Sequence, residues 1–169
     1  MSQTETQRRA LPALAEDGVL AGIIGGLTVA VWFLILDFAR GQPFLTPSLL
    51  GSVLFLGQSV EEAHTVNVIM VFAYTGLHGV LFLLAGTAIA WMVSQFERSP
   101  QFGLVFLLIF VMFESVLFGF EVTIVPNLVG ALGALSVGVA NLLSAVTMFW
   151  YLLARRPQAW AHLRESWEE

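Results

Sequence analysis

Four long apolar runs dominate this chain, and each is long enough to cross the hydrocarbon core of a bilayer. They cover residues 18–39, 66–93, 102–122 and 134–154. A core of about 30 Å needs about 20 helical residues at 1.5 Å per residue. Because lipid offers no hydrogen bonds, a spanning segment must pair its own backbone groups, which a helix does. The sequence therefore predicts an all-α fold, an integral membrane four-helix bundle.

The composition agrees with this fold and excludes several kinds of function. Of the 169 residues, 57% are hydrophobic and 11% charged, whereas soluble domains carry about 25% charged residues. The net charge is −5 without a basic patch, so we expect the bilayer as a partner and no nucleic acid. The absence of cysteine rules out disulfides, thiolate metal sites and iron–sulfur clusters.

Two shorter segments flank the predicted spans. Thr46 and Pro47 suit a helix start, with Thr as N-cap and Pro at the first helical position. The apolar run that follows, 48–56, is too short to span, so we expect a re-entrant or interfacial helix between the first two spans. At the other end of the chain, residues 155–169 carry aromatic and apolar residues at helical spacing, which predicts an amphipathic C-terminal helix.

The arginines predict the orientation of the chain, because it contains no lysine. With four spans, six arginines fall on one side and Arg40 on the other; the six are Arg8, Arg9, Arg98, Arg155, Arg156 and Arg164. The positive-inside rule then places both termini in the cytoplasm of a multi-pass cell-membrane protein. Residues 1–17 form the cytoplasmic N-terminal tail, 18–154 the transmembrane domain, and 155–169 the cytoplasmic C-terminal tail.

A stripe of small residues on the first span predicts close helix packing. Gly18, Gly22, Gly26 and Ala30 recur at a spacing of four, which places them on one face. Helices in lipid associate through such faces because backbones can approach closely. The stripe suits either the bundle interior or a dimer seam. We favour the interior, because Asp37 lies near the same face and an acid at a lipid-exposed seam is hard to satisfy.

Glu114 lies within the apolar run 102–122 and needs a partner there. A charge at a helix centre costs about 2.5–3.5 kcal/mol, so an intramembrane acid is by default a hypothesis about function. The neighbouring span carries His78 at a similar depth, and we favour a hydrogen bond between His78 and Glu114. Asn141 of the last span is a third candidate, and Glu121 shares the face of Glu114 two turns further on.

Together these residues predict a buried polar cluster that opens to the outer side. Its members are Asp37, His78, Glu114, Glu121 and Asn141. For Asp37 a second interpretation is an acid near the membrane boundary that pairs with Arg40, and we favour that one.

A metal site is one functional interpretation of the polar residues. Glu61 and His64 have the Glu-x-x-His spacing of carboxylate-bridged di-iron bundles, and Glu114 and Glu121 could complete a transition-metal site. The chain has no second Glu-x-x-His, which such bundles require. Haem would need a symmetric dimer that uses His78 twice, and we assign no cofactor.

Two further interpretations need no metal. His78 and Glu114 could relay protons or ions by changing charge in turn. Alternatively, the buried polar groups only join helices, and the chain is an accessory or scaffold component of a membrane assembly, with a homo-oligomer or membrane-protein partner. We favour this last interpretation and do not expect an enzyme, since nucleotide-binding, Ser-His-Asp and zinc-protease motifs are absent from the sequence.

Overall fold

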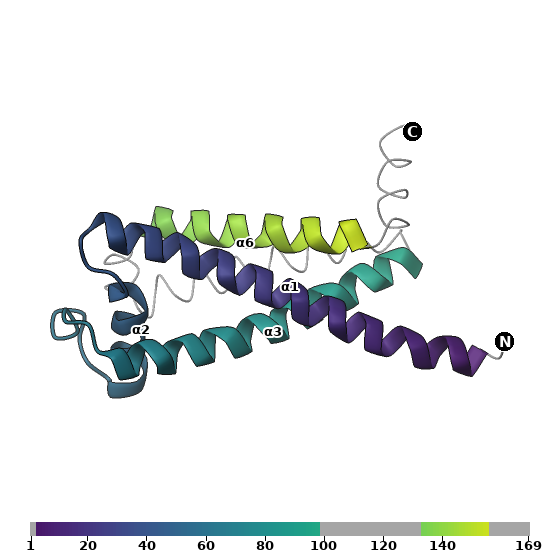
Figure 1. Ribbon diagram of the computed structural model, residues 1–169, viewed down its shortest axis with the longest axis horizontal. Coiled ribbons are helices and arrows are strands. Elements are labelled where there is room, and N and C mark those ends of the chain that lie inside the picture. The colour runs from purple at the N-terminus through teal and green to yellow at the C-terminus, as the bar shows by residue number, and fades with distance from the viewer. Residues whose placement is uncertain (1–2, 99–132, 156–169) are drawn as a thin grey trace.

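The computed structural model describes residues 3–98 and 133–155, which form four α-helices and no strand (Figure 1). The helices are α1 (Gln3–Ala39), α2 (Leu45–Leu56), α3 (Val68–Arg98) and α6 (Ala134–Arg155). Three of them contain segments long and apolar enough to cross a membrane: Leu14–Ala39, Val68–Gln95 and Ala134–Arg155. The predicted span 102–122 and the predicted helix after residue 155 lie outside the described residues.

Helix α1 is the central element of the described structure. It packs against both α3 and α6, which contact each other little, and α2 packs mainly on α3. The N-terminal end of α1 lies at the same end of the structure as the C-terminal ends of α3 and α6 (Figure 1). Helix α1 is therefore antiparallel to both, and α2 lies at the opposite end.

The crossing of α1 and α3 is built from glycine. A Cβ added at Gly22 would meet the backbone of Phe82 and Leu83, and one at Gly86 would meet the backbone of Gly18 and Gly22. The two backbones therefore touch where side chains are missing. The prediction that the glycine stripe packs inside the structure is confirmed for these positions.

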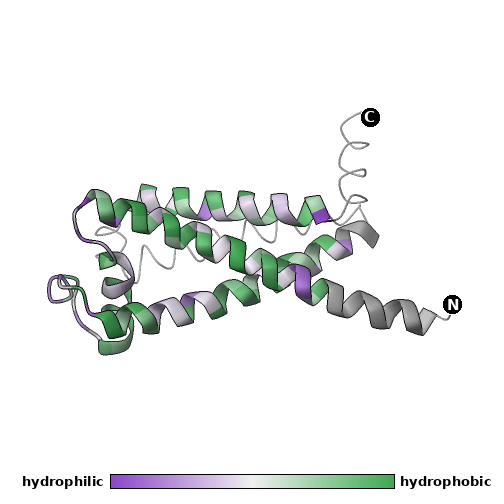
Figure 2. Ribbon diagram, in the orientation of Figure 1, coloured by the Kyte–Doolittle hydropathy of each residue, from purple (hydrophilic) through white to green (hydrophobic). Residues whose placement is uncertain are grey.

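Two clusters of buried apolar residues hold the helices together at their two ends. The first joins α1, α3 and α6 through Ala21, Ala90, Val93, Met148, Leu152 and Leu153. The second joins α1, α2, α6 and the turn after α2 through Phe33, Leu49, Ala63 and Ala140. The long helices are apolar over most of their length (Figure 2), and many of their large apolar residues are exposed, among them Leu27, Ile69 and Leu142. Such a surface suits lipid rather than water.

The starts of α2 and α3 differ from the sequence prediction. Helix α2 begins at Leu45, so the prediction of Thr46 as N-cap is wrong; the N-cap is Phe44, in the left-handed conformation at φ 67°. Helix α3 begins at Val68 because the side-chain oxygen of Asn67 accepts hydrogen bonds from the first turn, 3.0 Å from the nitrogen of Ile69.

Candidate functional site

Asp37 is fully buried between the end of α1 and the start of α2. One carboxylate oxygen accepts a hydrogen bond from the backbone nitrogen of Thr46 at 2.7 Å, and the other accepts one from the Thr46 hydroxyl at 2.7 Å. A negative charge at a helix N-terminus is stabilised by the helix dipole. The favoured pairing with Arg40 is wrong for the described structure, where Arg40 is exposed and in no ion pair with Asp37.

Buried hydroxyl groups continue from Asp37 along the inner face of α2. Ser48 is fully buried, and Ser52 is nearly so. The Ser48 hydroxyl accepts a hydrogen bond from the backbone nitrogen of Asn67 at 2.7 Å and lies 3.4 Å from the carbonyl oxygen of Thr65, to which it donates. This face of α2 is therefore fixed to the start of α3 by polar contacts.

Glu61 and His64 lie in an exposed turn between α2 and α3 rather than on a helix. His64 uses Nδ1 to contact the backbone carbonyl oxygen of Glu61 at 2.6 Å. Glu62 and Ser59 make a reciprocal pair, in which each side chain accepts a hydrogen bond from the other's backbone nitrogen. The Glu-x-x-His spacing here belongs to a turn, where i and i+3 side chains are not stacked on one helical face.

His78 lies on α3 and contacts α1 across the glycine crossing. Its Nε2 is 3.2 Å from the carbonyl oxygen of Gly26. Because a carbonyl can only accept, Nε2 carries the hydrogen, and Nδ1 is the nitrogen left to accept a proton or bind a metal. The ring packs between Tyr74 and Phe82, with centroid distances of 5.8 Å and 4.5 Å.

The described members of the predicted polar cluster occupy separate places. Gly26, the partner of His78, is eleven residues before Asp37 on α1, which corresponds to about 16 Å along the helix axis. Asn141 is exposed on α6. Glu114 and Glu121 lie outside the described residues, so the predicted pairing of His78 with Glu114 stays a prediction.

The metal set of Glu61, His64, Glu114 and Glu121 has only its first two members in the described structure. Within residues 3–98 and 133–155, no three His, Cys, Asp or Glu side chains gather closely enough to hold a metal ion. The predicted metal site needs the two glutamates outside those ranges, so it also stays a prediction.

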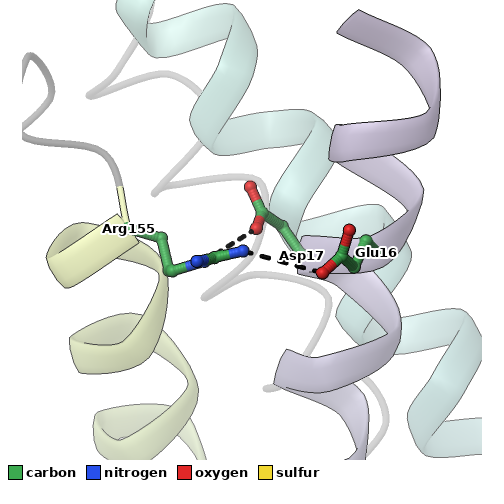
Figure 3. A network of polar contacts seen from close by, with 3 residues as sticks. All are labelled: Glu16, Asp17 and Arg155. Atoms are coloured by element: carbon green, nitrogen blue, oxygen red, sulfur yellow. Dashed lines mark hydrogen bonds and ion pairs between the residues drawn. The ribbon is translucent and has the colours of Figure 1, made fainter. Parts of the chain in front are cut away.

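An ion pair at the other end of the structure was not predicted from the sequence. Arg155, at the end of α6, points toward two neighbouring acids of α1 (Figure 3). Its Nε is 3.3 Å from an Asp17 carboxylate oxygen, and its terminal nitrogen is 3.8 Å from Glu16. The sequence placed all three residues on one side of the membrane, but only the packing of α6 on α1 selects which charges meet.

Two more polar contacts join α1 to α6 within the apolar part of the structure. The hydroxyls of Thr28 and Thr147 lie 3.2 Å apart. The indole nitrogen of Trp32 donates to the carbonyl oxygen of Ser136 at 3.1 Å. Hydrogen bonds of this kind between helices in lipid contribute about 0.6 kcal/mol on average.

Comparisons with protein-family models, with curated proteins and with solved structures find no match to this chain.

Proposed function

We propose that this chain is a multi-pass membrane protein that acts as a non-enzymatic accessory or scaffold subunit of a membrane assembly. The observation that carries the proposal is the way polar side chains are used in the three apolar helices. His78, Thr28 and Trp32 each make a hydrogen bond to a neighbouring helix. Polar groups that join helices stabilise a fold, whereas a catalytic or transport site needs them to converge on a common space.

The proposed topology has four spans with both termini in the cytoplasm. Its support is the arginine distribution, with six of seven on one side. The span proposed in addition to the three in the described structure is 102–122. It would connect the end of α3 at Arg98 to Gly133, just before α6, and these residues lie at opposite ends of the described structure (Figure 1). Under this topology α2 and the exposed acids Glu61 and Glu62 lie on the outer side.

The surface proposed to receive a partner lies on α3 and α6. No described residue lies within 4 Å of a Cβ added at Gly76, Gly79 or Gly138. Gly138 is one helical turn from the exposed Asn141. In lipid, small residues allow another helix to approach closely, and an amide can hydrogen-bond across the contact. The chemistry of this surface suits a transmembrane helix, and we propose that a helix of another subunit occupies it. If the span 102–122 of the same chain occupied it instead, filling the surface would lower the melting temperature of the chain itself.

The test is to fill this surface and measure assembly. The chain is purified in nanodiscs, and its oligomeric state and cross-linked partners are recorded for Gly79→Leu and Gly138→Leu. We expect the assembled fraction to fall while the melting temperature of the chain itself is unchanged. Leu84→Ala, a change at another exposed position of α3, serves as the matched control. Purification of the native chain as a monomer without any partner would contradict the proposal.

A second candidate is a proton or ion carrier, or a metal-binding protein, that uses Glu114 and His78. The observation in its favour is that His78 lies within an apolar helix and keeps Nδ1 for a proton or a metal while Nε2 donates to Gly26. Stoichiometric transition metal that is lost in Glu114→Gln and in His64→Ala would support the metal site. Proton uptake into liposomes that is unchanged in Glu114→Gln would remove the relay.

A further inference from the structure

Helix α2 buries its hydroxyl groups together with Leu49, and its last turn is apolar and exposed. Five of its residues are buried, namely Thr46, Ser48, Leu49, Gly51 and Ser52. Three of the five carry hydroxyl groups, while Leu54, Phe55 and Leu56 are 57%, 47% and 51% exposed. Two of these hydroxyls have partners from outside the helix, since Thr46 donates to Asp37 and Ser48 bonds to Asn67 and Thr65.

This arrangement is the reverse of what water selects. A surface helix in water turns its apolar face to the core and its polar face outward. In hydrocarbon the polar groups must find partners inside the protein, and the outside can be apolar without penalty. Buried hydroxyls beside an exposed apolar turn therefore indicate that acyl chains, rather than water, cover the last turn of α2.

The position of α2 beside α3 indicates the same surroundings. Gly51 of α2 packs so closely on Met70 that a Cβ at Gly51 would meet the Met70 backbone. Met70 lies in the first turn of α3, at the start of a segment apolar enough to span a membrane. Its neighbours Ile69 and Phe72 are 73% and 72% exposed. The outer face of α2 thus adjoins an apolar surface of the span at the same level.

We propose that α2 is embedded among phospholipid acyl chains of the leaflet at its end of the structure, with the 59–64 turn at the water surface. Leu54, Phe55 and Leu56 form the lipid-contacting last turn. The charged residues described in this region are Arg40, Glu61 and Glu62, with Asp37 buried, so they offer no basic cluster to anionic headgroups. The insertion is therefore driven by apolar contact and not by charge.

The absence of cysteine makes the test direct, because one introduced cysteine is labelled alone. Leu54→Cys and Phe55→Cys carry a polarity-sensitive fluorophore in phosphatidylcholine vesicles whose acyl chains are brominated. Glu61→Cys is the control in water, and Leu27→Cys, at an exposed position of α1, is the control in a span. We expect Leu54 and Phe55 labels to show blue-shifted emission and bromine quenching like Leu27, and the Glu61 label to be quenched by aqueous iodide instead.

Three outcomes overturn the inference. Iodide quenching at Leu54 equal to that at Glu61 shows a helix that faces water. Shielding from both quenchers shows a face covered by protein, either this chain or a partner. Bromine quenching that rises when anionic phosphatidylglycerol is added, or falls with salt, shows adsorption by charge. The inference rests on the proposed membrane location. The Leu27 label separates a failure of the inference about α2 from a failure of the membrane location, because a Leu27 label that bromine does not quench would contradict the membrane location itself.

Discussion

The carboxylate of Asp37 joins two helices because both of its oxygens bond to Thr46. It takes the place of the side-chain cap that Phe44, the residue before α2, does not supply. A bulky residue at positive φ is unusual, and such strain is of the order of 1–3 kcal/mol. The cap supplied by Asp37 helps to hold the chain in this conformation.

Replacing Asp37 by alanine is expected to destabilise the fold by about 1–3 kcal/mol, because the buried Thr46 nitrogen and hydroxyl lose their acceptors. The measurement is unfolding of the purified protein in detergent micelles. Arg40→Ala is the control, with an expected change near zero. Equal losses in the two variants would show that Asp37 acts through Arg40 instead.

His78→Phe is expected to lower stability by about 0.6–1.7 kcal/mol, the range for one hydrogen bond between helices in lipid. Phenylalanine keeps the ring between Tyr74 and Phe82 but cannot donate to Gly26. The same unfolding measurement applies, with Thr75→Val as the control on the exposed face of α3. A much larger loss would indicate that His78 has a second partner that the proposed scaffold function does not use.

At the scale of the helices, the contact between Gly22 and Gly86 fixes how α1 crosses α3. Van der Waals packing drives helix association in lipid, and it requires close approach. Glycine provides that approach at the crossing. A Cβ added at Gly76 or Gly79, which lie earlier on α3, would meet no described residue. The same residue type therefore has different roles on one helix.

Gly22→Ala and Gly86→Ala are expected to cost about 1–3 kcal/mol each, because an added methyl group meets backbone that has no room to move. Gly76→Ala is the matched control, since no described residue contacts its Cβ position; the higher helix propensity of alanine should stabilise it by up to about 1 kcal/mol. Thermal unfolding of the three variants in one detergent separates them. Similar values for Gly22 and Gly76 would contradict the glycine crossing.

Local patterns in the sequence predict the helices, but not the contacts that end and join them. The apolar runs anticipate α1, α3 and α6, and the spacing of Gly18 and Gly22 anticipates a packed face. The start of α2 was mispredicted because its cap comes from Asp37, nine residues before Thr46. Asp17 and Arg155 are 138 positions apart, and no periodicity in the sequence links them.

At the scale of the whole molecule, charged residues mark the end where α1 begins and α6 finishes. Arg155 meets Glu16 and Asp17 there, while the exposed acids Glu61 and Glu62 lie beyond the other ends of the helices. The pair of Arg155 with the exposed Glu16 contributes little stability, whereas its pair with the buried Asp17 is less screened by solvent. Under the proposed topology the two ends of the helices face opposite aqueous compartments.

Single cysteines should therefore report two opposite sides of the membrane. Glu16→Cys and Ala154→Cys are expected to react with a membrane-impermeant maleimide from one side, the cytoplasm, and Glu61→Cys only from the other. Whole cells and inverted vesicles are compared, with detergent-solubilised protein as the control for full labelling. Labelling of Glu61 and Ala154 from the same side would contradict the assignment of α3 or α6 as a span.

The glycine crossing has a consequence for biosynthesis. Under the proposed membrane location, α1 reaches the bilayer before Gly86 of α3 has been synthesised, so the face that holds Gly18 and Gly22 enters lipid without its partner. Helix α6, the last of the described helices to be made, then brings Arg155 to Asp17. Until α3 is inserted, the glycine face of α1 is therefore free to pair with helices of other proteins. Insertion of α3 covers that face.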